Sequence, residues 1–169
     1  MKKRTKTILG VVVVLVIAVI VIPMYISRQQ TTFRAEVTDH MSMLDTLETL
    51  VIKKIPTTDS YDEEEVIIKD PQEIRNMLKL AKDIELRRLK HTDISERFEG
   101  NPYYYDWQLR TKKEDQFTEG FGITFYNEHA VSIYSGYKTR DKLENYEITN
   151  DFNLSEVERL FTNLKEGKK

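Results

Sequence analysis

The sequence predicts an α+β fold: a single antiparallel sheet of about five strands packed with two helices, preceded by one N-terminal transmembrane helix. Three observations lead to this prediction. An uncharged apolar segment follows a basic tail, several short segments alternate apolar and polar residues, and two longer segments place apolar residues at helical spacing behind a typical N-cap. The predicted regions are a cytoplasmic tail (1–7), a signal-anchor helix (8–26), a stalk or linker with helical periodicity (27–46) and an extracytoplasmic domain (47–166).

The N-terminal segment has the basic head and apolar body of a secretory signal, so it is either cleaved or retained. Ile8–Ile26 has no charged side chain and would form a helix about 28 Å long, close to the hydrocarbon thickness of a membrane. A cleaved signal usually has a shorter apolar region that ends in small residues, whereas Pro23–Arg28 here reads PMYISR. We therefore favour a retained, single-pass anchor in the cell membrane over cleavage, with the N-terminus cytoplasmic and the domain outside.

The composition excludes several classes of function. The chain has 26 Lys and Arg against 28 Asp and Glu, and five of the basic residues lie at or before position 28. The rest of the chain is therefore acidic, and nucleic acid is not an expected partner because its binding depends mostly on Lys and Arg. The absence of cysteine excludes disulfides, thiolate nucleophiles, cysteine zinc sites and a lipid carried on cysteine.

The first part of the predicted domain holds two strands and a helix. Leu47–Ile55 and Glu65–Lys69 are rich in β-branched residues and are separated by turn-like residues. The helix has a clear start, with Asp70 as N-cap and Pro71 at the first helical position. Its apolar face must pack on a sheet and comprises Ile74, Met77, Leu78, Ala81 and, at its end, Ile84.

The segment NPYYYDWQLR, residues 101–110, crowds four aromatic residues into five positions. Side chains alternate along a strand, so one face would carry Tyr103, Tyr105, Trp107 and Leu109. That large apolar set predicts a core-facing strand. Tyr104 is then left on the opposite face, together with Asp106.

A hairpin and a terminal helix complete the predicted domain. Pairing Ile123 with Ile133 in GITFYNEHAVSIYSG sets Gly122 opposite Tyr134, Phe125 opposite Val131 and Tyr126 opposite Ala130, with a three-residue turn at 127–129. YEIT, residues 146–149, predicts a last strand. The terminal helix has Asn153 or Ser155 as its cap and buries Leu154, Val157, Leu160, Phe161 and Leu164.

No segment carries a recognisable catalytic or cofactor-binding motif, so we predict no catalytic residue, no metal ligand and no cofactor. The acidic run Asp62–Glu65 lacks the ligand alternation and glycine of a calcium loop and favours a solvated turn. The three histidines lie in separate segments, and His129 is best explained as a turn residue. The candidate binding residues are Tyr104, Tyr126 and Tyr134, which would form a patch on the outward face of the sheet.

The basic tail, the apolar segment, the IKDPQEI helix, the GITFYNEHAVSIYSG hairpin and the NLSEVERLF helix together resemble a known group of proteins. These are the small membrane-anchored or lipoprotein domains of unknown function from low-GC Gram-positive bacteria, such as the YhfM-like group. The resemblance covers about Leu47–Leu164 and implies an extracytoplasmic location and an α+β domain. This chain departs from the lipoprotein members because it has no cysteine to carry a lipid.

These observations predict a non-enzymatic binding or interaction module that is anchored in the membrane through Ile8–Ile26 and has a protein or cell-envelope partner. Two alternatives stay open. One is a cell-envelope hydrolase or divalent-metal enzyme that uses carboxylates. The other is a structural subunit of a membrane complex, in which the apolar segment itself is the interface.

Overall fold

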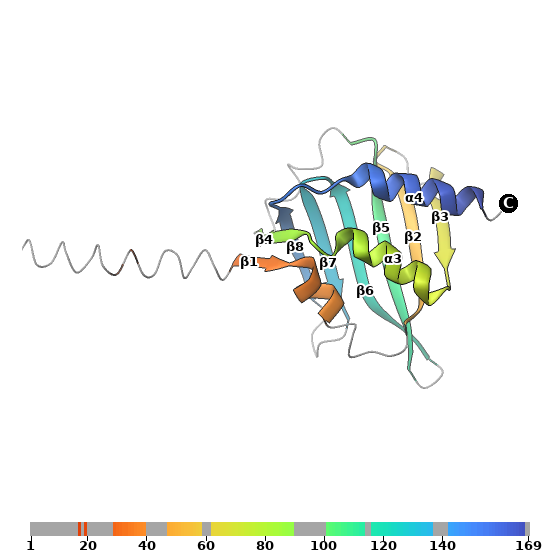
Figure 1. Cartoon of the computed structure of the whole chain (residues 1–169), viewed down its shortest axis with the longest axis horizontal. Coiled ribbons are helices and arrows are strands. Elements are labelled where there is room, and N and C mark those ends of the chain that lie inside the picture. The colour runs from red at the N-terminus through yellow and green to blue at the C-terminus, as the bar shows by residue number, and fades with distance from the viewer. Residues whose placement is uncertain are drawn as a thin grey trace, which may run out of the picture. The chain divides into compact units, whose positions relative to one another are not determined.

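The computed structural model of the chain describes Ile17, Val19 and residues 29–39, 47–58, 62–89, 101–113, 116–136 and 142–167. The chain divides into two units, Met1–Gln30 and Thr31–Lys169, and the fold described below is that of the second unit. It consists of one sheet with helices on a single face (Figure 1).

The sheet has eight strands in the order β1-β4-β8-β7-β6-β5-β2-β3, and β2 to β8 pair antiparallel along it. The strands are β1 (Gln30–Thr32), β2 (Leu47–Pro56), β3 (Glu64–Ile68), β4 (Glu85–Arg88), β5 (Tyr103–Lys113), β6 (Gln116–Asn127), β7 (Ala130–Ser135) and β8 (Lys142–Ile148). Three helical elements accompany them: the π-helical turn η1 (Arg34–Thr38), α3 (Pro71–Ala81) and α4 (Leu154–Glu166).

The predicted fold class is wrong in two respects. The sheet has eight strands instead of about five, because β1 and β4 are too short to show an alternating pattern in the sequence. The preceding helix is also predicted to reach Ile84, whereas it ends at Ala81, just before β4 begins at Glu85. The second correction concerns the predicted transmembrane helix: within the described ranges no helix is long and apolar enough to cross a membrane. Apart from Ile17 and Val19, residues 8–26 lie outside those ranges.

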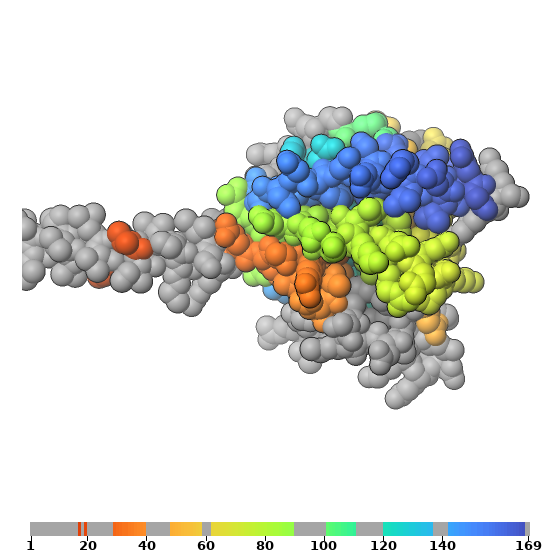
Figure 2. Space-filling model, in the orientation of Figure 1, coloured from red at the N-terminus to blue at the C-terminus, as the bar shows by residue number. Residues whose placement is uncertain are grey.

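Both predicted helices form, and their N-caps explain where they start. The Asp70 carboxylate accepts a hydrogen bond from the Gln72 backbone N–H at 2.6 Å, which confirms the predicted cap of α3. The Asn153 side chain accepts from the Ser155 N–H at 3.0 Å, so Asn153 and not Ser155 caps α4. Both helices lie on the same face of the sheet (Figure 1), and Figure 2 shows them forming the surface on that side together with the segment around η1.

The predicted register of the β6–β7 hairpin is confirmed along most of its length. Ile123 pairs with Ile133, and Gly122 pairs with Tyr134. The predicted turn is wrong by one residue, because a bulge after Phe125 pairs Asn127 with Ala130. The Asn127 side chain accepts a hydrogen bond from the His129 N–H at 2.8 Å, which stabilises the shorter turn.

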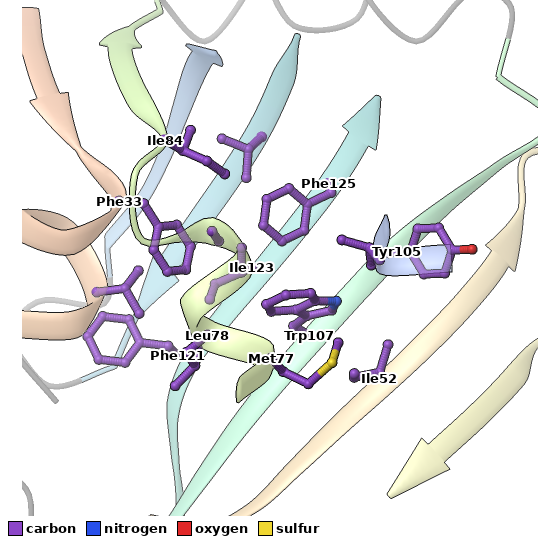
Figure 3. Close-up of a cluster of buried hydrophobic side chains, with 14 of the residues drawn as sticks. Phe33, Ile52, Met77, Leu78, Ile84, Tyr105, Trp107, Phe121, Ile123 and Phe125 are labelled. Carbon is purple, nitrogen blue, oxygen red and sulfur yellow. The ribbon is translucent and has the colours of Figure 1, made fainter. Parts of the chain in front are cut away.

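The core lies between the sheet and the helices and is centred on Trp107, whose side chain is fully buried (Figure 3). Its indole packs edge-on against Phe125 with ring centroids 5.0 Å apart. Tyr105 and Leu109 of the same strand are also buried, so the predicted core face of the aromatic segment is confirmed for these residues. The core then continues through Met77 and Leu78 of α3 and Phe161 of α4.

The segment predicted as a stalk or linker contributes directly to this core. Phe33, which precedes η1, and Val37, which lies within it, are both fully buried. The Phe33 ring stacks against Phe125 with centroids 6.4 Å apart, and its backbone N–H donates to the Ile84 carbonyl at 3.0 Å. The core therefore extends upstream of Leu47 (Figure 3).

Candidate functional site

The face of the sheet turned away from α3 and α4 is called the open face below, because none of the described helices packs against it (Figure 1). The pairing registers arrange its side chains in two neighbouring rows across the sheet. The polar row contains Lys53, Asp106, Thr124, Ser132 and Asn145, and the glycine row contains Val51, Gln108, Gly122, Tyr134 and Leu143.

The structure brings two of the three predicted tyrosines together. The rings of Tyr104 and Tyr126 lie with centroids 6.0 Å apart at an angle of 48°. Tyr134 belongs to the glycine row, and its partner Gly122 precedes Tyr126 by four residues, about 13 Å along β6. The three side chains are half-buried on one face but form two separate spots. Burial is the main cause that raises the pKa of Tyr104, followed by the charge of Asp106.

Hydrogen bonds between side chains hold Asp106 and Thr124 of the polar row and connect them to Gln108 of the glycine row. The Thr124 hydroxyl donates to one carboxylate oxygen of Asp106 at 3.0 Å, and the Gln108 amide donates to the other at 2.9 Å. The Arg110 guanidinium donates in turn to the Gln108 carbonyl oxygen at 3.2 Å. These bonds fix the orientation of three planar polar groups on a half-buried surface.

A hollow of about 150 Å³ lies on the open face where Gly122 has no side chain. A Cβ atom at Gly122 would lie 3.6 Å from the Cβ of Tyr134, so the ring of Tyr134 stands beside the gap. The remaining lining combines polar and apolar groups from three strands, namely Asp106, Gln108, Phe121, Thr124 and Leu143.

A second and larger hollow, of about 490 Å³, lies at the turn end of the β6–β7 hairpin beside the start of α4. It is called the hairpin cavity below. Its lining residues come from three separate parts of the chain: Asn101, Tyr103, Asn127, Glu128, His129, Leu154, Ser155 and Glu158. From the sequence, His129 is predicted only as a turn residue. Nothing in the spacing of His129 and Glu158 shows that the turn and α4 meet.

A polar cluster on the wall of the hairpin cavity joins β2, β5 and α4. Glu158 accepts hydrogen bonds from the Tyr103 hydroxyl at 2.7 Å and from the Lys54 ammonium at 3.0 Å. The Lys54 nitrogen also lies 3.8 Å from the centre of the Tyr103 ring. Burial, followed by the hydrogen bond to Glu158, raises the pKa of Tyr103 to about 12. The hydrogen bonds from Tyr103 and then Lys54 lower the pKa of Glu158.

Three residues of the acidic run, Glu63–Glu65 at the start of β3, are paired with lysines. Lys53 binds Glu63 at 2.5 Å, and this hydrogen bond is the main cause that raises the pKa of Lys53. Lys165 of α4 binds Glu64 at 2.7 Å. Among the described residues, no group of three or more His, Asp and Glu side chains is arranged to hold a metal ion.

No family model, curated protein or solved structure matches this chain. The resemblance to the YhfM-like group therefore stays a prediction.

Proposed function

We propose that the chain is a non-enzymatic binding domain, held at the outer side of a cell membrane through residues 8–26, that binds a protein or an envelope component through the open face. The observation that carries the proposal is the open face itself. It presents half-buried tyrosines beside a fixed row of polar side chains, on the side of the sheet where none of the described helices packs.

The chemistry of the open face is suited to contact with a ligand. A tyrosine provides a large contact area and loses few rotamers on binding, so it gives affinity at a low entropy cost. Tyr104 and Tyr126 already restrict each other through ring contact. Asp106 and Gln108 are oriented before any ligand arrives, which lowers the cost of ordering them in a complex.

Glu158, on the wall of the hairpin cavity, is poorly suited to act as a general acid. A carboxyl group that acts as a general acid at neutral pH needs a raised pKa. Tyr103 and Lys54 lower the pKa of Glu158 instead, so this carboxylate is held in its charged form. A fixed negative charge of this kind stabilises the packing of α4 on the sheet.

The proposed membrane location rests on the hydropathy of the N-terminal segment. Ile17 and Val19 are helical and leave 54% and 71% of their surfaces exposed. Exposing large apolar side chains to water is unfavourable, whereas exposing them to lipid is not. Resistance of the full chain to carbonate extraction, together with digestion of its domain by protease added to whole cells, would support this location. A chain found only in the carbonate-soluble fraction would contradict it.

Crosslinking in intact cells tests the binding face. The full chain with Tyr104→Ala, Tyr126→Ala and Tyr134→Ala should lose most of the partners that wild type captures, because the substitutions remove all three aromatic rings from the open face. A matched triple variant on the helix side, Gln72→Ala, Lys79→Ala and Arg159→Ala, removes three exposed side chains and should capture them normally. Melting temperatures verify that both variants fold. Equal capture by both would overturn the proposal.

A further inference from the structure

The hollow at Gly122 indicates which class of ligand the open face takes. We infer that the open face binds a linear, uncharged glycan, with one sugar ring seated in the hollow against Tyr134. This inference rests on the proposed function, because it assigns a ligand class to the same face. Four features support it. The hollow is apolar on one side and polar on the other, and Asp106 can accept further hydrogen bonds. The nearby cationic side chains are already bonded, and the tyrosines are spaced along β6.

The lining of the hollow matches the surface of a sugar ring. A pyranose has apolar C–H groups on its faces and hydroxyl groups around its rim. Tyr134 and Leu143 supply apolar surface on one side of the hollow, and Asp106 and Thr124 supply polar groups on the other. Gly122 forms the floor between them, and its missing side chain lets a ring approach the backbone of β6. The volume of about 150 Å³ is comparable with that of a single sugar ring.

Asp106 has acceptor capacity left for sugar hydroxyls. Each of its carboxylate oxygens accepts one described hydrogen bond, from Thr124 or from Gln108. A carboxylate offers about four lone-pair sites, so the group can accept further donors without breaking these bonds. The same bonds hold the carboxylate in a fixed orientation, and fixed planar acceptors can bind adjacent hydroxyl groups with little loss of entropy.

The charges around the hollow favour an uncharged glycan over a protein surface. Lys53, the cross-strand neighbour of Asp106, is bound to Glu63. The Arg110 guanidinium donates a hydrogen bond to the Gln108 side chain. A protein docked over the hollow would desolvate the Asp106 carboxylate, which is energetically costly. Charged residues are depleted from the cores of protein interfaces for this reason. Sugar hydroxyls can donate hydrogen bonds to the carboxylate and so replace those of the displaced water.

The tyrosines are spaced for an extended chain and not for a single sugar. The ring pair of Tyr104 and Tyr126 lies about 13 Å along β6 from Gly122, a distance that a few linked sugar rings span. Thr124 lies on β6 between these two spots and faces the same side. A glycan lying along β6 would therefore meet an aromatic ring at both ends and hydroxyl-binding groups in the middle.

Calorimetric titration of the full chain tests the inference. The protein is held in micelles of a zwitterionic detergent without sugar groups and titrated with cellohexaose, chitohexaose and maltohexaose. Wild type should bind at least one of them. Gly122→Ala places a methyl group in the hollow at an ordinary contact distance from Tyr134, and Asp106→Asn removes the charged acceptor. Each change should weaken binding about tenfold or more, and the distant Gly167→Ala should leave it unchanged.

The outcomes separate this inference from the proposed function. If wild type binds none of the three hexasaccharides, or if Gly122→Ala and Asp106→Asn both bind as tightly as wild type with unchanged melting temperatures, the glycan inference is overturned. If the hexasaccharides fail but the triple tyrosine variant still loses a crosslinked protein, the ligand is a protein or peptide, and the proposed function stands without the glycan. If the tyrosine variant loses no partner and no hexasaccharide binds, both fall.

Discussion

The two faces of the sheet are carried by the same strands but are stabilised differently. On the helix-covered face, Trp107 and Phe125 are buried and pack mainly through apolar contacts. On the open face, the adjacent residues Asp106 and Thr124 are half-buried and are held by a hydrogen bond between their side chains. Apolar burial contributes most of the stability of a fold, whereas hydrogen bonds at a surface mainly orient groups. The covered face therefore holds most of the apolar core, and the open face carries half-buried polar groups that are oriented by hydrogen bonds.

The largest expected effect comes from breaking the covered face at its centre. Trp107→Ala should lower the free energy of unfolding by about 3 to 5 kcal/mol, because it leaves a large cavity against Met77 and Phe125. Asp106→Ala, one residue earlier and on the open face, should cost about 1.5 kcal/mol or less. Urea unfolding of both variants measures the difference. Similar costs would mean that the two faces are not energetically distinct.

The N-terminal segment should behave as part of the covered face. Phe33→Ala should cost about 3 kcal/mol, because the buried ring stacks on Phe125. Its neighbour Arg34 has a side chain that is 71% exposed, and Arg34→Ala should change stability by about 0.5 kcal/mol or less. Chemical unfolding of the two variants measures this contrast. If Phe33→Ala is as mild as Arg34→Ala, residues 30–38 do not fold together with the sheet.

Alkaline pH should weaken the covered face selectively. The pKa of Tyr103 rises to about 12 in the folded chain, above its ordinary value of 10. The unfolded chain therefore releases this proton first, so the stabilisation is complete below pH 10 and is lost as pH rises from 10 to 12. The free energy of unfolding should fall less steeply between pH 10 and 12 in Tyr103→Phe than in wild type. Tyr104→Phe, on the open face, should reduce this slope by a smaller amount. Unfolding followed from pH 8 to 12 measures both slopes, and identical slopes would contradict the prediction.

The smallest expected effect comes from the polar row. Thr124→Val keeps the shape of the side chain but removes the donor to Asp106, and it should cost about 1 kcal/mol or less. A double-mutant cycle with Asp106→Asn should give a coupling energy of about 0.5 to 1 kcal/mol. A coupling much larger than this would mean that the polar row contributes to stability as a packed core does.

The covered face was largely predictable because it follows from local patterns. Strand alternation identified Tyr105, Trp107 and Leu109 as core residues, and the preference of Asp for the N-cap identified the start of α3. Tyr103 fits the pattern only in part, because it is half-buried and donates its hydroxyl to Glu158. The same alternation placed Gly122 opposite Tyr134, although the bulge after Phe125 altered the turn.

The rest depended on contacts between distant parts of the chain. β1 and β4 contain three and four residues, too few to show a period, and they become strands by pairing with a sheet that is already present. Nothing in the sequence near Phe33 shows that it meets Phe125. The hairpin cavity likewise exists only because α4 folds back over the end of the hairpin. The hollow on the open face needs the registers of four strands at once.

The place of Phe33 in the core also determines what shedding by a protease would release. A cut before residue 29 would free a fragment that keeps Phe33 and Val37 together with the sheet on which they pack. A cut after Asp39 would leave both side chains on the other fragment and open a cavity beside Phe125. The first cut would leave the folded domain intact, whereas the second would leave it weakened. The position of the cut would thus decide whether the separated domain stays stably folded.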